Sequence, residues 1–247
     1  MEQLAALVAE PQCLSAALRA LAQVAERGDE QAIAEVTMFL AHWSAHVRLD
    51  AVWALAQLVG KDDERVIAAV GGLVGDPDGA VRCEAVEALA EWADKGNECA
   101  ITIVFSFLKD VDGVVRQHAL RGLAHLAEKG DGRVVEAVTS HLEDKHLFVR
   151  RAALKALAQL AETGDERVIA AMSARLVDEH PFVRRAAIKA LAQVVDRCNP
   201  RGAVELVSAC AEDEDEIVRR AANEALARLA GGRGFSLTHG TSLSACR

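Results

Sequence analysis

The pair Val-Arg recurs six times in this chain at a nearly constant interval. It occurs at Val47-Arg48, Val81-Arg82, Val115-Arg116, Val149-Arg150, Val183-Arg184 and Val218-Arg219. Each step is 34 residues long, except the last, which is 35. A fixed period of this size is typical of an array of small stacked units, in which each unit buries its core against its neighbours. The 247 residues therefore predict one elongated solenoid rather than a closed globule.

One period, residues 165–197, can be interpreted as two helices joined by a turn. Gly164-Asp165 is typical of a helix end followed by an N-cap, and apolar residues then recur at helical spacing from Val168 to Leu176. The segment Asp178–Pro181 predicts a turn, with the proline suited to the first turn of the next helix. Apolar residues from Val183 to Val194 mark that second helix. The unit is therefore predicted to be a helical hairpin.

The same pattern predicts about seven hairpins over residues 1–230. Their first helices are expected to begin near Asp29, Asp63, Asn97, Asp131, Asp165 and Arg201. A degenerate repeat, residues 1–28, precedes them, with Cys13 in the place of the valine and Leu14 in the place of the arginine. Terminal repeats are commonly atypical because they cap the core. Residues 231–247 leave the pattern and are rich in Gly, Ser and Thr, which predicts a flexible C-terminal tail.

Composition limits the classes of partner and compartment. The net charge of −9 argues against nucleic-acid binding through the overall field of the protein, although it leaves a local basic strip open. The first residues have no basic segment followed by an apolar run, so we expect no signal peptide, and no apolar stretch is long enough to predict a membrane span. The six cysteines form no zinc-binding spacing. We interpret them as buried thiols of a cytoplasmic or other reducing compartment, which leaves an organelle open.

A second recurring residue identifies the class of repeat. An aspartate lies five residues before the valine in five units, giving the pattern Asp…Val-Arg-x-x-Ala-x-x-Ala-Leu. This pattern resembles HEAT repeats, notably the short HEAT-like class of bilin-lyase-type proteins, over roughly residues 11–230. The tetratricopeptide pattern needs a tyrosine, which this chain lacks, and the ankyrin Thr-Pro-Leu-His is also missing. The resemblance implies an all-α fold, a right-handed α-solenoid (superhelix) whose second helices line the concave side.

The resemblance also implies that the recurring Asp and Arg form a structural ladder between neighbouring hairpins. The residues assigned to this ladder are Asp76, Arg82, Asp110, Arg116, Asp144, Arg150, Asp178, Arg184, Asp213 and Arg219. A carboxylate at a helix start can accept backbone N–H bonds and an arginine fork together. His42 stands in the aspartate position of the first full turn, so we expect the ladder to be interrupted there.

The second helices also carry positions that vary between repeats. Counting from each valine, positions +2, +6 and +10 are predicted to point away from the core. Leu49 and Trp53 are expected to form an apolar spot, with Trp53 as a candidate interface anchor. An acidic stretch consists of Asp50, Glu84, Glu87 and Glu91, and a basic strip of Arg121, Arg151, Lys155, Arg185, Lys189 and Arg220. Such a strip suits a protein partner with an acidic or amphipathic segment.

Plainer interpretations of these residues stay open. The charges could serve only to solubilise an alanine-rich helix face, and Trp53 could pack against a neighbouring helix. His42 and His46 are spaced for one helical face, but no third ligand is close in sequence, so we expect neither a metal nor a cofactor.

Function is less well specified than fold. No nucleotide-binding or hydrolase motif occurs, and the His-Glu dipeptides of HEAT-repeat iron hydroxylases are missing. We predict a non-catalytic protein–protein interaction scaffold. Two alternatives remain: a bilin-lyase-like chaperone or assembly factor for a pigment-protein, and a HEAT-like nucleic-acid-binding protein such as a DNA glycosylase.

Overall fold

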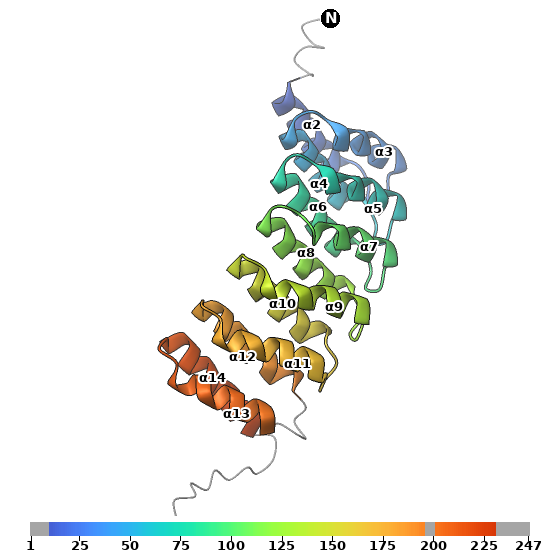
Figure 1. The fold of residues 1–247 in the computed structure, drawn as a ribbon. Helices are drawn as coiled ribbons and strands as arrows, with labels where there is room; N and C mark the ends of the chain where they lie inside the picture. The colour runs from blue at the N-terminus through green and yellow to red at the C-terminus, as the bar shows by residue number, and fades with distance from the viewer. Residues whose placement is uncertain (1–9, 196–200, 231–247) are drawn as a thin grey trace, which may run out of the picture. The chain divides into compact units, whose positions relative to one another are not determined.

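A computed structural model of the chain describes residues 10–195 and 201–230, and in these ranges every regular element is a helix (Figure 1). The first helices of the hairpins are α3 (Glu30–Met38), α5 (Glu64–Gly71), α7 (Glu98–Phe107), α9 (Gly132–Ser140), α11 (Glu166–Ser173) and α13 (Arg201–Ala209). The second helices are α2 (Pro11–Val24), α4 (Ala45–Leu58), α6 (Gly79–Trp92), α8 (Gly113–Leu126), α10 (Leu147–Leu160), α12 (Pro181–Val194) and α14 (Glu216–Ala230). The all-α solenoid of helical hairpins is thus confirmed.

Six complete hairpins and helix α2 lie within the described ranges. Residues 1–9 of the predicted cap repeat and the whole predicted tail 231–247 lie outside them. The chain divides into two compact units, Met1–Glu162 (unit 1) and Thr163–Arg247 (unit 2). Unit 1 holds helices α2 to α10, and unit 2 holds α11 to α14.

The first helices begin where the sequence predicts. Asp29, Asp63, Asn97, Asp131 and Asp165 are N-caps, and the side chain of each accepts a hydrogen bond from a backbone N–H of the first turn. Most first helices end in a short 3-10 helix that the sequence pattern did not predict. These are η1 (Phe39–Ala41), η2 (Gly72–Gly75), η3 (His141–Glu143), η4 (Ala174–Val177) and η5 (Cys210–Glu212). Each tightens the chain before it turns into the second helix.

The recurring valine marks the core of each hairpin. Val47, Val81, Val115 and Val149 in unit 1 and Val183 and Val218 in unit 2 have no exposed surface. Within unit 1 the second helices pack side by side in chain order, from α2 to α10, and in unit 2 α12 packs against α14. Because the small residues Ala51, Ala85, Ala119 and Ala153 lie four residues after the valines and are fully buried, neighbouring helices can approach closely.

A backbone hydrogen bond joins successive hairpins at the turns between them. The donor is a residue with positive φ, and the acceptor is a carbonyl near the end of the following second helix. The bonds are Gly28 to Leu58, Asp62 to Trp92, Gly96 to Leu126 and Gly130 to Leu160 in unit 1, and Gly164 to Val194 in unit 2. Asp62 is the non-glycine in this set (φ 63°), and its carboxylate accepts from the Asp94 amide and the Asn97 side chain, which offsets the strained conformation.

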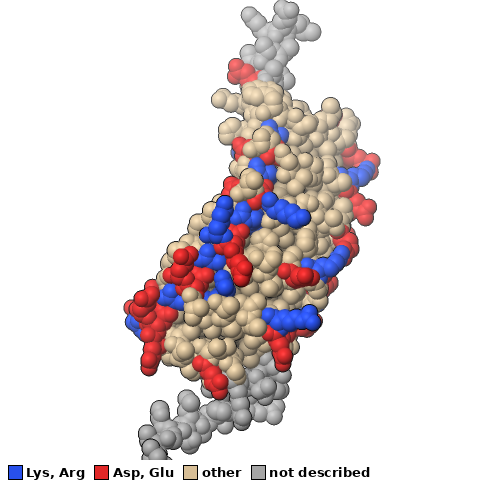
Figure 2. Space-filling model, in the orientation of Figure 1, with Lys and Arg blue, Asp and Glu red and all other residues tan. Residues whose placement is uncertain are grey.

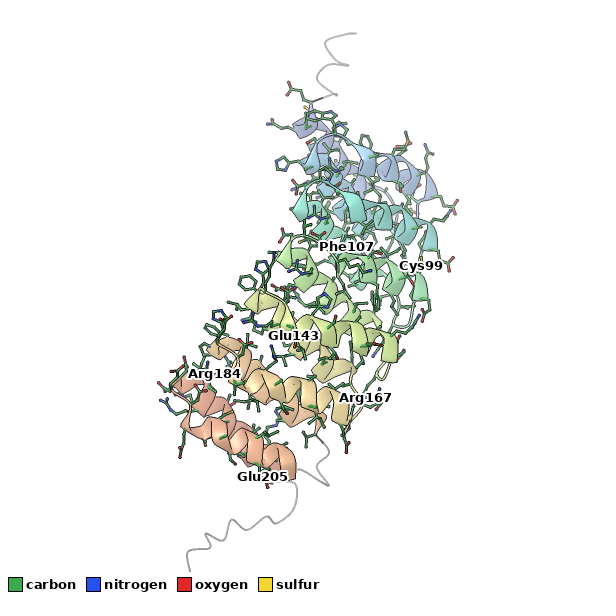
Figure 3. All side chains as sticks on the ribbon, viewed as in Figure 1. Cys99, Phe107, Glu143, Arg167, Arg184 and Glu205 are labelled. Carbon is green, nitrogen blue, oxygen red and sulfur yellow. The ribbon has the colours of Figure 1, made fainter. Side chains whose placement is uncertain are left out.

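A ladder of arginine–aspartate pairs joins the hairpins at the opposite turns, where the first helix of each hairpin leads into its second. Nε and Nη2 of each arginine donate to the two oxygens of an aspartate in the next hairpin, at distances of 2.6 to 2.9 Å. The pairs are Arg48–Asp76, Arg82–Asp110 and Arg116–Asp144 in unit 1, and Arg184–Asp213 in unit 2. Figure 3 shows Arg184 at the beginning of α12.

Each member of the ladder also holds its own turn. Arg116 donates through Nη1 to the Asp110 and Val111 carbonyls, and the Asp144 carboxylate accepts from the His146 amide at 2.8 Å. Arg150 and Arg219 likewise donate to carbonyls of their own turns, and Asp178 accepts from the His180 amide. A ladder residue therefore satisfies backbone groups and links two hairpins at once.

The ladder begins at Arg48. At His42, where the aspartate is missing, ring atom Nδ1 accepts from the Ser44 amide at 3.1 Å, as the aspartates do in later turns. The equivalent of the arginine one repeat earlier is Leu14. His42 thus replaces the turn-forming role of the aspartate without its charge.

Three carboxylates of the ladder, those of Asp110, Asp144 and Asp213, have lowered pKa values. For Asp110 and Asp144, burial alone would raise the pKa, but hydrogen bonds from Arg82, Arg116 and the turn amides outweigh it and hold the pKa below the usual range. For Asp213 the hydrogen bond from Arg184 is the largest effect and lowers the pKa. The ionised forms of these three carboxylates are therefore stabilised by the fold.

We expect the ladder to contribute strongly to stability. Replacing Arg116 by methionine keeps the aliphatic stem but leaves the buried Asp144 carboxylate without its fork, which should cost about 3–5 kcal/mol. The control is Arg133→Met, because Arg133 is exposed and pairs with an equally exposed Glu98. Urea unfolding followed by circular dichroism should show a large loss for Arg116→Met and a midpoint close to wild type for Arg133→Met. Equal losses in the two variants would contradict this role of the ladder.

The low pKa of Asp110 also predicts a dependence on pH. Because the folded-state pKa lies below the value of about 3.9 in the unfolded chain, the stabilisation is complete above that value and is lost as the pH falls through the folded-state pKa. The difference in unfolding free energy between wild type and Asp110→Asn should therefore be largest at pH 7 and shrink toward pH 3. Urea titrations at both pH values measure it. A difference that stays constant would mean that Asp110 does not act through its charge.

Candidate partner-binding surface

The outward positions of the second helices form the candidate site, which we call the second-helix face. In unit 1 it consists of Leu49, Trp53, Glu84, Glu87, Glu91, Arg121, Arg151 and Lys155, and in unit 2 of Arg185, Lys189 and Arg220. In α10, for example, Val149, Ala153 and Leu157 are buried while Lys155 is exposed and Arg151 is half-buried. The helical period thus puts the recurring residues inside and the varying residues on the surface.

The apolar end of the face consists of Trp53 and Leu49. Trp53 keeps 38% of its surface exposed, and Leu49 is half-buried. The guanidinium of Arg19, from α2, lies 5.9 Å from the centre of the Trp53 ring. The ring of Trp53 is therefore partly covered and partly exposed.

Asp50 does not belong to the exposed acidic stretch, contrary to the sequence expectation. It is only 8% exposed, and it accepts a hydrogen bond from Arg19 Nε at 2.9 Å. Arg19 lies 31 residues away in the sequence, on the neighbouring helix α2. The acidic stretch is thus reduced to the three glutamates of α6.

A groove of about 370 Å³ lies between α6 and α8. Its acidic wall is formed by Glu87 and Glu91 of α6, and its basic wall by His118, Arg121 and His125 of α8. The floor contains Val86, Ala90 and Gly122. A Cβ atom on Gly122 would lie 3.3 Å from methyl groups of Val86 and Val104, so the glycine lets the two helices approach closely at this point.

The two walls of the groove are only loosely paired. His118 Nδ1 lies 2.9 Å from Glu87 Oε1, but the geometry does not satisfy a hydrogen bond. Arg121 Nη1 lies 3.9 Å from the same oxygen. Glu84, Glu91 and His125 have no ion-pair or hydrogen-bond partner within residues 10–195 and 201–230. The groove therefore presents two walls of opposite character that neutralise each other only at Glu87.

The pKa values of two groups on α6, Glu84 and Cys83, are raised in part by neighbouring negative charges. Burial, followed by the charges of Glu87 and Glu91, raises the pKa of Glu84. Burial, followed by the charges of Asp112 and Glu87, raises the pKa of the Cys83 thiol to about 11. The acidic wall is thus a region where an added negative charge is disfavoured and a positive charge is favoured.

The basic part of the face is divided between the two units. In unit 1, no carboxylate of the described part of the chain lies within ion-pair distance of Arg151 or Lys155. In unit 2, Lys189 lies 4.0 Å from Glu224 and Arg220 lies 3.5 Å from Glu216, while Arg185 has no ion pair to any described residue. These five cations and Arg121 occupy outward positions, and Arg121, Lys189 and Arg220 have acidic neighbours.

The first helices carry a surface that sequence reasoning did not single out. In Figure 2 the charged side chains of unit 1 gather along its edges, and the surface between them, over α5 and α7, is largely uncharged. A second groove, of about 500 Å³, lies between α7 and α9 and is lined by Ile101, Thr102, Phe105, Arg133, Glu136 and Ala137. The apolar run Ile101–Phe105, which extends to outward positions of α7, is the sequence signal that would have indicated it.

The described residues give no sign of a metal or membrane site. No three His, Cys, Asp or Glu side chains in residues 10–195 and 201–230 lie close enough together to hold a metal ion. His146 instead stacks on Phe148, with ring centres 6.3 Å apart. None of the described helices is both long enough and apolar enough to cross a bilayer.

Comparison with known proteins agrees with this architecture. A family model that describes HEAT repeats matches residues 2–90, 40–124, 68–158, 101–192 and 158–227. The chain belongs to the HEAT-repeat family. A search of curated proteins finds no sequence match.

Solved HEAT-like structures share the fold at low sequence identity. The archaeal HEAT-like repeats protein from Thermococcus onnurineus NA1 is 17% identical, with a TM-score of 0.58 over 94% of this chain and 97% of that one. An engineered protein is 19% identical, with a TM-score of 0.56 over 81% of this chain and 97% of that one. A second engineered protein is 23% identical, with a TM-score of 0.56 over 91% of this HEAT-repeat chain and 66% of that one. At this identity the likeness concerns the fold alone.

The cysteines of this HEAT-repeat protein are less uniform than the sequence suggests. Cys210 is buried and Cys83 is intermediate, but Cys13 and Cys99 are exposed, which corrects their expected burial. Figure 3 shows Cys99 at the start of α7. Cys198 and Cys246 lie outside the described residues.

The raised pKa of Cys83 predicts low reactivity. At pH 8 the thiol is almost entirely protonated, and the thiolate is the reactive form. Brief iodoacetamide treatment followed by peptide mapping should modify Cys13 and Cys99 well before Cys83. In the Glu87→Gln variant, which removes one of the charges that raise this pKa, Cys83 should react faster. Labelling of Cys83 as fast as Cys99 in the native protein would contradict the raised pKa of this thiol.

Proposed function

We propose that this HEAT-repeat protein is a non-catalytic interaction scaffold that binds an acidic or amphipathic segment of a partner protein on its second-helix face, which is the concave face in HEAT-like arrays. The contacts assigned to unit 1 are Leu49, Trp53, Arg121, Arg151 and Lys155, and those assigned to unit 2 are Arg185, Lys189 and Arg220. Arrays of stacked hairpins commonly use one extended surface for binding. The recurring core and ladder residues beneath surface residues that differ between repeats support this role.

The proposal rests mainly on the lack of carboxylate partners for Arg151 and Lys155 of α10. Arg116 and the other forked arginines of the ladder are occupied by aspartate and carbonyl partners. Arg151 and Lys155, one helical turn apart on the same helix, have no carboxylate partner in the described part of the chain. A partner carboxylate would therefore gain two unoccupied cations without first breaking an internal ion pair.

Two further features support the proposal. Repeat folds of this kind are typically non-catalytic. We place the protein in a cytoplasmic or other reducing compartment, because Cys13, Cys83, Cys99 and Cys210 are free thiols.

The test measures binding of a fluorescein-labelled 12-residue peptide of alternating Glu and Leu by fluorescence anisotropy. We expect salt-dependent binding, and the Arg151→Glu/Lys155→Glu variant should raise Kd at least about tenfold. The matched control is Lys109→Glu/Lys129→Glu, which makes the same charge change at exposed turn positions of unit 1.

Circular dichroism melts establish that both variants remain folded. An unchanged affinity in the Arg151→Glu/Lys155→Glu variant would remove α10 from the binding surface. An equal loss in both variants would show that only the net charge of the protein matters.

A further inference from the structure

The second-helix face of unit 1 changes its chemistry in a fixed order along the stack of helices. Helix α4 presents the partly covered ring of Trp53. Helix α6 presents Glu84, Glu87 and Glu91. Helices α8 and α10 present Arg121, Arg151 and Lys155. Because these helices pack in chain order, the apolar, acidic and basic regions follow one another across the face.

The groove between α6 and α8 is the boundary between the acidic and basic regions. Glu87 and Glu91 face it from α6, and His118, Arg121 and His125 face it from α8. Glu84 and Glu91 have no partner in the described residues, so two of the three carboxylates on α6 lack a counter-charge. Crowding of these charges is also consistent with the raised pKa of Glu84, whose largest cause is burial.

These regions select against a uniformly charged partner. A carboxylate placed on α6 would meet the same repulsion that Glu84 experiences from Glu87 and Glu91, whereas a lysine or arginine there would find unpaired carboxylates. On α10 the preference is reversed, because Arg151 and Lys155 are unpaired cations. The order of charges along a partner segment therefore matters as well as its total charge.

We propose that unit 1 recognises an extended peptide segment in which a basic block lies between an apolar residue and an acidic block. The apolar residue packs on Leu49 and the open edge of Trp53, the basic block lies along the glutamates of α6, and the acidic block reaches Arg121, Arg151 and Lys155. This inference deepens the proposed scaffold function and depends on it.

Helix spacing sets the length of each block. Packed helices lie about 8–10 Å apart, and an extended chain rises about 3.3 Å per residue, so each block corresponds to about three residues. The path from α4 to α10 crosses three helix steps, which corresponds to about nine residues in all.

The test compares two labelled nine-residue peptides of identical composition, each made in both chain directions. One has the order Trp-Leu-Ala, three Lys, three Glu; the other has the acidic block in the middle. Anisotropy titrations of the full chain should give at least about tenfold tighter binding for the basic-middle peptide in one of the two directions. The alternating Glu and Leu peptide of the previous test is included as the reference ligand.

Variants of α6 test the origin of this preference. Glu87→Gln/Glu91→Gln should remove most of the discrimination between the two peptides, and Glu87→Lys/Glu91→Lys should favour the acidic-middle peptide. The matched control is Glu64→Lys/Glu136→Lys, on exposed positions of α5 and α9, which should keep the wild-type preference. Thermal melts confirm that each variant is folded.

The outcomes separate this inference from the proposed function. If the reference peptide binds and depends on Arg151 and Lys155, but the two isomeric peptides bind equally or the acidic-middle peptide binds more tightly, the charge order is wrong and the scaffold proposal stands. If none of the peptides binds, both proposals fail.

Discussion

The pairing of an arginine in one hairpin with an aspartate in the next is the interaction on which the other features of each unit depend. It links hairpins at one edge, and the backbone bonds from Gly28, Asp62, Gly96 and Gly130 link those of unit 1 at the other. Two anchored edges fix the register of neighbouring helices. Because the register repeats, outward positions of successive helices line up into columns, and a surface with an ordered chemistry becomes possible.

The ladder specifies how neighbouring hairpins pair, but burying its charged groups has a desolvation cost that other parts of the fold must offset. Burying an ion pair removes both groups from water, so its value depends on complete hydrogen bonding. Here Asp144 accepts from both Arg116 and the His146 amide, and Arg116 also satisfies carbonyls of its own turn. The hydrophobic stabilisation itself comes from the valine, alanine and leucine positions of the second helices. The buried polar groups of the ladder are fully hydrogen-bonded in only one register of those helices, so the ladder selects that register.

Local charge, rather than net charge, governs the candidate surface. The chain carries a net charge of −9, yet Arg151 and Lys155 form an unpaired basic patch on α10. Charges separated by more than about 8–10 Å are largely screened at physiological salt, which is close to the spacing of adjacent helices. Helices two steps apart in the stack, such as α6 and α10, can therefore present opposite potentials to different parts of one partner.

The sequence by itself determined the repeat, the hairpins, the N-caps such as Asp131 and the outward positions such as Lys155, because these follow from local periodicity and from side-chain hydrogen bonds within one turn. Only the tertiary structure decided that Arg19 pairs with Asp50 and covers Trp53, that Gly122 lets α6 and α8 approach closely beside a groove, and that Cys99 is exposed. These features depend on which side chains from different helices meet, about thirty residues apart in sequence. The spacing of residues in the sequence does not specify those side-chain contacts, because they are set by the packing of one hairpin on the next.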